Sequence, residues 1–328
     1  MPERHEVDLL IIGAGPVGLF AAYYAGFRAL SVGIVDSLPE IGGQISAMYP
    51  EKQIMDVAGF PMIKGRDLVK NLGEQADHSN PTYLLERTAI SLTEDDDAGT
   101  VTVGLDDGAE VVAKAVIITA GIGKFTPREL PAANEWEGDE IAFFVPSFDD
   151  YVDRDVVIVG GGDSAFDWAL HLEPIARSIT LIHRRDAFRA HQHTVDQVMA
   201  SSVNVITSAN VSALVGDSGL EAVDVESVKD GSVTRIKAQR IVAALGFIAD
   251  LSAMADWGLE LDKRHIVVDS AMKTNLSRVF AAGDIVEYPG KVRLIAVGFG
   301  EAATAVNNSA VAIDPSAKVF PGHSSEGT

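Results

Sequence analysis

Residues 156–172 read VVIVGGGDSAFDWALHL, and residues 9–25 read LLIIGAGPVGLFAAYYA. In both stretches a short apolar run, typical of a buried parallel strand, leads into a glycine-rich turn and then into a helical pattern. A strand, glycine turn and helix in this order form the first half of a βαβ unit. Each stretch therefore predicts its own doubly wound α/β domain.

The glycine spacing predicts that both units bind a dinucleotide. The first glycine of such a loop allows a tight turn, the second lets the backbone approach a pyrophosphate, and a small third residue lets the helix pack on the strand. The helix N-terminus then offers free N–H groups to the phosphates. The alternative is an ordinary glycine-rich turn, but each match follows a strand and opens a helix. The residues concerned are Gly13, Gly15, Pro16 and Gly18 in the first unit, and Gly160, Gly162, Asp163, Ser164 and Ala165 in the second.

The residue 23 positions after each first glycine distinguishes the two ligands. It is Asp36 in the first unit and His183 in the second, where Arg184 and Arg185 follow. A carboxylate accepts hydrogen bonds from free ribose hydroxyls, whereas guanidinium groups bind a 2′-phosphate. The first site should therefore hold an unmodified ribose and the second NADP, with Arg189 as a candidate third charge. The alternative for the arginines is a solvated pair after a strand.

Two dinucleotide sites in one chain suggest a flavin together with a nicotinamide. The segment VFAAGDI, residues 279–285, ends a strand at Gly283-Asp284, where a carboxylate could hold a ribityl hydroxyl of FAD. The alternative is an ordinary aspartate at a strand end. Residues 298–312, GFGEAATAVNNSAVA, predict a helix of small residues whose N-terminus could stabilise negative charge on the flavin.

Composition excludes several classes of function. The 328 residues include no cysteine, which rules out disulfides, thiolate metal sites and thiol catalysis. The net charge of −21 argues against nucleic-acid binding. The N-terminus MPERHEVD lacks a signal-peptide core, and the apolar runs are too short to span a bilayer, so we expect a cytoplasmic protein without a membrane partner. His191 and His193 lack a third ligand candidate nearby, so no metal is expected.

Taken together, the motifs resemble the thioredoxin-reductase-like flavoproteins. GGGDSA followed by HRRDAFRAH is characteristic of their NADPH half, and the resemblance covers essentially the whole chain. It implies an α/β fold with two Rossmann-like, three-layer ββα domains, the NADPH domain being inserted into the FAD domain. The expected boundaries are 1–119 for the first part of the FAD domain, 120–245 for the NADPH domain, and 246–328 for the second part with its C-terminal tail. Hinges are expected near 119–124 and 243–248.

One branch of that superfamily fits the absence of cysteine. Where thioredoxin reductases carry Cys-x-x-Cys, this chain has Phe143-Phe144-Val145-Pro146. The thioredoxin-reductase-like ferredoxin–NADP reductases lack the dithiol. Their signatures are matched here by GGQISAMYPEKQIMDVAGFP (42–61), GIGKFTPREL (121–130) and FPGHSS (320–325).

This resemblance implies a flavin site and a homodimer. Tyr49 would stack on one face of the flavin, and His323 would cover the other from the partner subunit. The alternatives are a loop aromatic for Tyr49 and an unordered terminus for His323. Many relatives have glutamate at Asp36, and the shorter acid should still reach the ribose. The implied FAD contacts are Asp36, Gly43, Gln44, Tyr49, Ala89, Phe125, Gly283, Asp284 and Ser325.

The implied activity is electron transfer between NADPH and ferredoxin through FAD, which needs no acid–base residue. The leading alternative is an NADPH-dependent flavin reductase with flavodoxin, a quinone or an external disulfide as acceptor. A flavin monooxygenase would need an F-x-G-x-x-x-H-x-x-x-W motif, which residues 123–155 lack. A non-catalytic NADPH sensor is the third alternative. Because ferredoxins are usually acidic, docking would need a basic face, with Lys52, Lys64, Arg66, Lys70, Lys124 and Arg128 as candidates.

Overall fold

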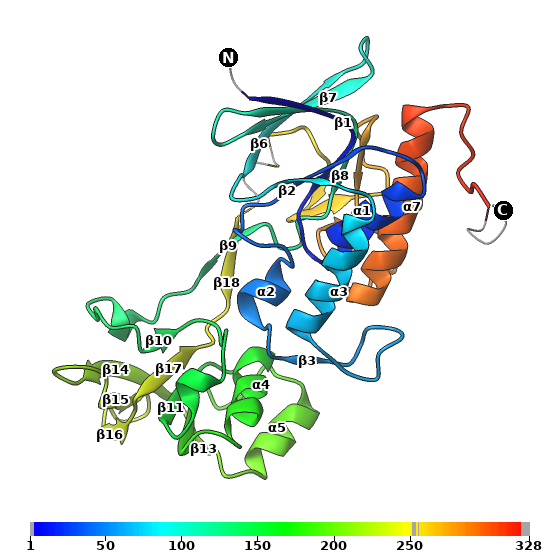
Figure 1. Ribbon diagram of the computed structural model, residues 1–328. Helices are drawn as coiled ribbons and strands as arrows, with labels where there is room; N and C mark the ends of the chain where they lie inside the picture. Colours follow the sequence, from blue (N-terminus) through cyan, green and yellow to red (C-terminus); the bar gives the residue numbers. More distant parts are fainter. Residues whose placement is uncertain (1–2, 251–253, 255, 323–328) are drawn as a thin grey trace. The chain divides into compact units, whose positions relative to one another are not determined.

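The computed structural model describes residues 3–250, 254 and 256–322, and the chain divides into two compact units (Figure 1). The first unit comprises Met1–Ser46, Gln53–Phe125 and Ala249–Thr328, and the second comprises Ala47–Lys52 and Thr126–Ile248. Along the sequence, the second unit thus interrupts the first. The two connecting strands, β9 (Lys124–Pro127) and β18 (Phe247–Asp250), pair with each other.

The first unit contains a mixed sheet in the order β5-β2-β1-β8-β7-β6, with β21 pairing with the end of β8. Pairs β1–β2, β1–β8, β2–β5 and β8–β21 are parallel, whereas β6, β7 and β8 form an antiparallel meander. The last four residues of β1, Leu9 to Ile12, are buried, as the apolar run there predicts. The strands are β1 (Arg4–Ile12), β2 (Val32–Val35), β5 (Thr82–Leu84), β6 (Ala89–Asp95), β7 (Thr100–Leu105), β8 (Glu110–Ile118) and β21 (Val279–Ala281).

Three helices cover this sheet. Helix α1 packs against both α3 and α7, and α7 also contacts β8 and β21 (Figure 1). Small buried residues on α1 and α7 let these helices approach closely. The remaining elements are short. The unit includes α1 (Pro16–Gly26), the first residues of α2 (Gln44–Met48), β3 (Gln53–Ile54), β4 (Ile63–Lys64), α3 (Gly65–Asp77), β19 (Leu261–Asp262), β20 (His265–Val267), β22 (Val286–Glu287) and α7 (Ile295–Ile313).

The register of the parallel strands brings four sequence motifs to one edge. Ile12 lies opposite both Val35 and Ile118, and Ile118 lies opposite Ala281. The residues that follow these strands, including Gly13, Asp36 and Gly283, are therefore neighbours at the carboxyl edge. Ligands of doubly wound sheets bind at this edge.

The second unit contains a fully parallel sheet in the order β10-β17-β11-β12-β13 and a separate antiparallel meander of β14, β15 and β16. Helix α4 packs against β11 and β12 of the parallel sheet, and α5 packs against α4. These sheets confirm the predicted α/β class. The elements are β10 (Ile141–Ala142), β11 (Asp155–Val159), α4 (Asp163–Leu172), β12 (Ser178–His183), α5 (Gln192–Met199), β13 (Asn204–Thr207), β14 (Ala209–Val215), β15 (Ala222–Ser227), β16 (Val233–Lys237) and β17 (Arg240–Ala243).

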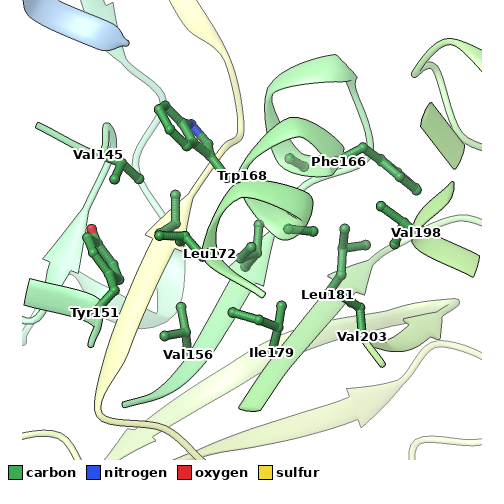
Figure 2. Packing of buried hydrophobic residues seen from close by; sticks show 14 of the residues in the cluster. Val145, Tyr151, Val156, Phe166, Trp168, Leu172, Ile179, Leu181, Val198 and Val203 are labelled. Atoms are coloured by element: carbon green, nitrogen blue, oxygen red, sulfur yellow. The ribbon is translucent and has the colours of Figure 1, made fainter. Parts of the chain in front are cut away.

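Helix α4 is held to its sheet by an apolar core that fixes the second glycine loop. Phe166, Leu172 and Leu181 are fully buried in this cluster, which Figure 2 shows between α4 and the strands. The Phe166 ring also meets the edge of Phe188, with their centroids 4.7 Å apart. The position of the loop at the start of α4 therefore depends on this packing.

Replacing Phe166 with alanine should lower the free energy of unfolding of the second unit by about 3–5 kcal/mol, because the buried ring leaves a cavity. Urea unfolding followed by circular dichroism measures this change. Met199, at the end of α5, is 60% exposed, and Met199→Ala should change stability by no more than about 0.5 kcal/mol. Equal effects of the two substitutions would contradict this account of the core.

Candidate dinucleotide and flavin sites

The first glycine loop is tightly packed at two positions and open at one. A Cβ on Gly13 would lie 2.6 Å from the Thr119 carbonyl oxygen, and a Cβ on Gly18 would lie 1.9 Å from the Gly13 carbonyl oxygen. A Cβ on Gly15 would meet no atom within 4 Å. Two glycines are thus needed by the protein itself, whereas the third leaves open space at the carboxyl edge.

The open space at Gly15 faces the start of a helix. Gly15 is the N-cap residue of α1, no side chain caps the helix, and Pro16 occupies the first turn. The first amides of a helix have no partner within it and favour an anion. This cradle, which any larger side chain would fill, fits the pyrophosphate of a dinucleotide.

Asp36 lies beside this loop. Its carboxylate accepts hydrogen bonds from the backbone N–H of Ala14 at 2.6 Å and of Leu38 at 2.9 Å. Burial raises the pKa of Asp36, and the backbone hydrogen bonds oppose this effect. Each carboxylate oxygen has a second lone pair, so the group can also accept hydrogen bonds from a ribose.

The segment before α2 closes over the same loop. Gly42 donates its N–H to the Ala14 carbonyl at 2.8 Å, and a Cβ on Gly43 would lie 3.0 Å from the Gly15 Cα. A Cβ on Gly121 would lie 3.1 Å from the Gln44 side-chain nitrogen. Gly43 thus lies beside the first glycine loop and Gln44 beside Gly121, and their contact with a flavin stays a prediction.

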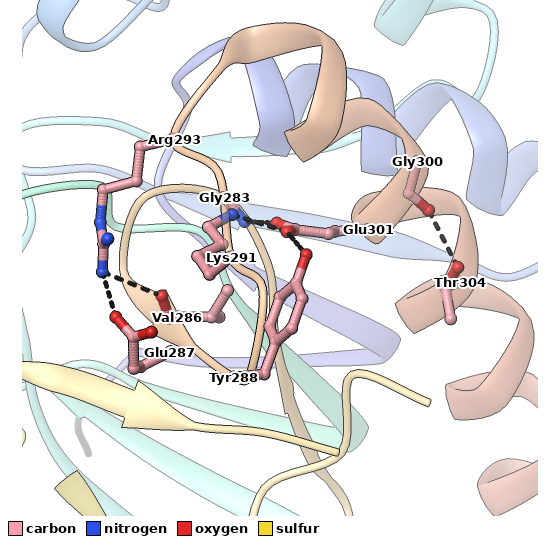
Figure 3. A network of polar contacts seen from close by, with 9 residues as sticks. All are labelled: Gly283, Val286, Glu287, Tyr288, Lys291, Arg293, Gly300, Glu301 and Thr304. Carbon is pink, nitrogen blue, oxygen red and sulfur yellow. Dashed lines mark hydrogen bonds and ion pairs between the residues drawn. The ribbon is translucent and has the colours of Figure 1, made fainter. Parts of the chain in front are cut away.

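Gly283 and Asp284 follow β21 and are held by α7. The Gly283 N–H donates to the Glu301 carboxylate at 2.8 Å, and the same carboxylate accepts from Tyr288 and Lys291 (Figure 3). Burial raises the pKa of Asp284, whereas the charge of Lys291 lowers it. Asp284, the predicted ribityl contact, is therefore partly buried and follows a residue that Glu301 holds.

The second glycine loop repeats the pattern of the first. A Cβ on Gly160 would lie 2.5 Å from the Ala244 carbonyl oxygen and 2.9 Å from the Ala165 Cβ, whereas a Cβ on Gly162 would meet nothing within 4 Å. Gly162 is the N-cap residue of α4, and no side chain caps that helix. The loop therefore offers a second open cradle for a pyrophosphate. Asp163 and Ser164 follow it directly, in the first turn of α4.

The segment that carries the arginines is tied to this loop. The Arg189 N–H donates to the Gly161 carbonyl at 2.8 Å, and the His191 N–H donates to the Asp163 carboxylate at 2.8 Å. The His183 ring lies so close to Gly161 that a Cβ there would approach it to 2.3 Å. Backbone and ring contacts thus fix the distance between the arginines and the phosphate cradle.

The arginines form a group of uncompensated positive charges. Arg184, Arg185 and Arg189 are exposed, and within the described part of the chain none of them pairs with a carboxylate. Burial and the charges of the three arginines lower the pKa of His183. Such a group attracts a 2′-phosphate more strongly than a solvated pair engaged with acidic neighbours would.

Other predicted residues are placed differently or not at all. The Tyr49 ring packs against the core cluster of the second unit, with the Lys52 ammonium 5.9 Å from its centre, and Lys52 pairs with Asp167 on α4. The structure thus shows a packing role for Tyr49, and flavin stacking stays a prediction. Ala89 begins β6 and Phe125 falls in β9. His323 and Ser325 lie outside the described residues.

The members of the candidate basic face are spread over several elements. Lys52 pairs with Asp167 and Lys70 with Glu74. Lys64 ends β4, Arg66 lies in the first turn of α3, and Arg128 follows β9. Among the described residues, no group of three or more His, Asp or Glu side chains is arranged to hold a metal ion. No helix in that same part of the chain is both long and apolar enough to cross a bilayer.

Sequence patterns alone did not single out Tyr288, Lys291, Glu301 and Thr119. The Thr119 hydroxyl donates to the Gly13 carbonyl at 2.9 Å and so supports the tight turn. A signal for Glu301 was present, since it is the one acidic residue in the helical run 295–313. Its partners, in contrast, lie in an irregular segment that no motif marks.

Comparison with known proteins agrees with this geometry. The model of the pyridine nucleotide-disulphide oxidoreductase family matches residues 7–308. A ferredoxin–NADP reductase of Nocardioides sp. is 70% identical over 98% of each chain, and one of Halalkalibacterium halodurans is 49% identical over 99% of each. A solved thioredoxin reductase of T. acidophilum aligns with a TM-score of 0.78 and 25% identity, covering 93% of this chain and 98% of that one. The chain is therefore an oxidoreductase that belongs to the pyridine nucleotide-disulphide oxidoreductase family, in its branch of thioredoxin-reductase-like ferredoxin–NADP reductases.

Proposed function

We propose that the protein carries electrons between NADPH and ferredoxin through a bound FAD. The observation that carries the proposal is the pair of open glycine loops, which have side chains of opposite charge beside them. One lies beside the carboxylate of Asp36, and the other lies beside the uncompensated Arg184 and Arg185. The names of the similar proteins support ferredoxin as the partner.

In this proposal residues 1–119 and 246–328 form the FAD-binding domain, and residues 120–245 form the NADPH-binding domain. Bound FAD supplies the redox chemistry, since a flavin takes a hydride from NADPH and can release electrons one at a time. The chain itself binds and orients the two cofactors. The first amides of α1 and α4 hold the pyrophosphates, Asp36 holds the ribose of FAD, and the arginines select NADPH.

The remaining features of the proposal come from the family resemblance. Tyr49 and His323 would stack against the flavin, and Ser325 and Phe125 would contact it. His323 would come from the partner in a cytoplasmic homodimer. Because the chain has no cysteine, electrons cannot leave through an internal disulfide, and an external carrier is required.

An anaerobic assay of NADPH oxidation tests the proposal. Purified protein is mixed with NADPH and cytochrome c, with ferredoxin, flavodoxin or no carrier, and NADH replaces NADPH in a parallel series. We expect reduction of cytochrome c to be several times faster with ferredoxin than without a carrier. Reduction that gains nothing from ferredoxin but responds to flavodoxin would replace the proposed partner.

A further inference from the structure

A single buried carboxylate joins three donors behind the Gly283–Asp284 turn. The Glu301 carboxylate accepts from the Tyr288 hydroxyl at 2.6 Å, from the Lys291 ammonium at 2.6 Å and from the Gly283 N–H at 2.8 Å (Figure 3). The side chains of Lys291 and Glu301 are only 1% and 4% exposed. The pair is therefore almost completely removed from water.

This network lies where the first unit is expected to hold its flavin. Gly283 has a φ of +87°, and a Cβ there would lie 3.2 Å from Val17 in the first turn of α1. A Cβ on Gly298, in the first turn of α7, would lie 2.5 Å from the same valine and 3.5 Å from the Gly283 Cα. The starts of α1 and α7 and the end of β21 thus meet at the amide that Glu301 binds.

Stability alone is a weak reason for such a pair. Removing two charges from water costs several kcal/mol, and a buried ion pair is often no more stabilising than apolar residues of the same volume. An electrostatic effect on a charged ligand nearby is a stronger reason for the Lys291–Glu301 pair, because a charge in a poorly solvated site acts strongly on its neighbours. The charge of Lys291 already reaches Asp284, since it lowers the pKa of that carboxyl against the larger effect of burial.

We propose that Tyr288, Lys291 and Glu301 are positioning residues for the flavin. Glu301 fixes the Gly283–Asp284 turn that contacts the ribityl chain, and Lys291 balances the negative charge of Glu301 beside the flavin. The inference rests on the proposed binding of FAD to the first unit. The family resemblance names none of these three residues as a flavin contact, so the inference gives them a role that the resemblance does not supply.

The network has an electrostatic consequence that a purely structural role would lack. Lys291→Met leaves a buried carboxylate without its cation, and Gly283 and Tyr288 keep donating to that carboxylate. Because reduction adds negative charge to the flavin, an uncompensated anion nearby disfavours reduction and lowers the reduction potential. The double variant Lys291→Met/Glu301→Gln removes both charges and keeps an amide oxygen that can accept the Gly283 N–H. Its potential should return toward that of the unchanged protein.

The experiment measures the flavin midpoint potential and the dissociation constant of FAD for full-length proteins. FAD affinity should fall roughly tenfold or more in Lys291→Met, because the carboxylate that holds the Gly283 N–H loses one of its three donors. Tyr288→Phe, which deletes one donor, should weaken FAD binding less and move the potential less. Lys114→Met is the matched control, because Lys114 pairs with Asp8 at 2.7 Å in the same sheet but is 55% exposed. Thermal unfolding of each protein without FAD identifies any variant that fails to fold.

The outcomes separate this inference from the proposed function. A lowered potential in Lys291→Met that recovers in the double variant supports the network. An unchanged potential and an unchanged FAD affinity in folded Lys291→Met protein would overturn it. If Lys291→Met did not fold, an unchanged FAD affinity in folded Tyr288→Phe protein would overturn it. Failure of the unchanged protein to bind FAD would instead overturn the proposed function.

Discussion

Gly15→Val should give a folded protein that no longer binds FAD. The new Cβ would meet no protein atom within 4 Å, and the φ of −70° at Gly15 suits any residue. Only the glycine N-cap is lost, which costs about 1 kcal/mol. In the proposed complex, however, the valine occupies the space of the pyrophosphate and blocks the first amides of α1. We expect FAD affinity to fall by roughly 100-fold or more, the equivalent of two charge-assisted hydrogen bonds.

The measurement is a titration of the cofactor-free protein with FAD, followed by flavin fluorescence and by the yellow colour of the purified protein. Gly18→Val is the matched comparison, because a Cβ there would lie 1.9 Å from the Gly13 carbonyl oxygen. That variant should fail to fold, whereas Gly15→Val should unfold near the temperature of the unchanged protein. A yellow Gly15→Val protein with normal FAD affinity would show that no pyrophosphate lies at this loop.

The double substitution Arg184→Ala/Arg185→Ala should remove the preference for NADPH. These guanidinium groups have no carboxylate partner among the described residues, and the segment that carries them is fixed to the second glycine loop. In the proposed complex both bind the 2′-phosphate, and each such hydrogen bond contributes about 1.5–3 kcal/mol. The kcat/KM for NADPH should therefore fall by roughly 100-fold or more, while that for NADH changes little.

Steady-state rates with a saturating artificial acceptor measure both substrates without depending on ferredoxin. Arg235→Ala controls for the loss of an exposed guanidinium in the same unit, because Arg235 on β16 is paired with Asp224 at 2.7 Å. It should leave both kcat/KM values close to those of the unchanged protein. Equal losses with NADPH and NADH in the double variant would mean that the arginines act on something other than the 2′-phosphate.

The glycine loops and their strand-end partners were predictable because their signals are local. A run such as VVIVGGGDSA fixes a strand, a turn and a helix start within a few residues, and parallel register then brings Gly13 and Asp36 to one edge. The helical run of small residues was predicted for the same reason, and it forms α7. In each case a period or a spacing in the sequence carried the information.

The buried network was not predictable because it depends on tertiary contacts. Lys291 lies in an irregular segment. Because lysine side chains are mostly exposed, sequence alone predicts that Lys291 faces solvent. Only the packing of α7 against β21 shows that it is almost fully enclosed with Glu301. Tyr49 shows a related limit, since a loop aromatic can pack on whichever core its chain reaches, and here it packs on the cluster that includes Trp168.

The interrupted order of the units has a consequence for synthesis on the ribosome. The sheet of the first unit needs β21 beside β8, and α1 needs α7, so its last elements emerge only after residue 279. Both sheets of the second unit, together with α4 and α5, lie between residues 141 and 243 and have left the ribosome earlier. Since domains fold as units when their segments become available, the inserted unit can fold first. During that interval the end of β8 that later pairs with β21 lacks this partner, and an unpaired strand edge can pair with another chain.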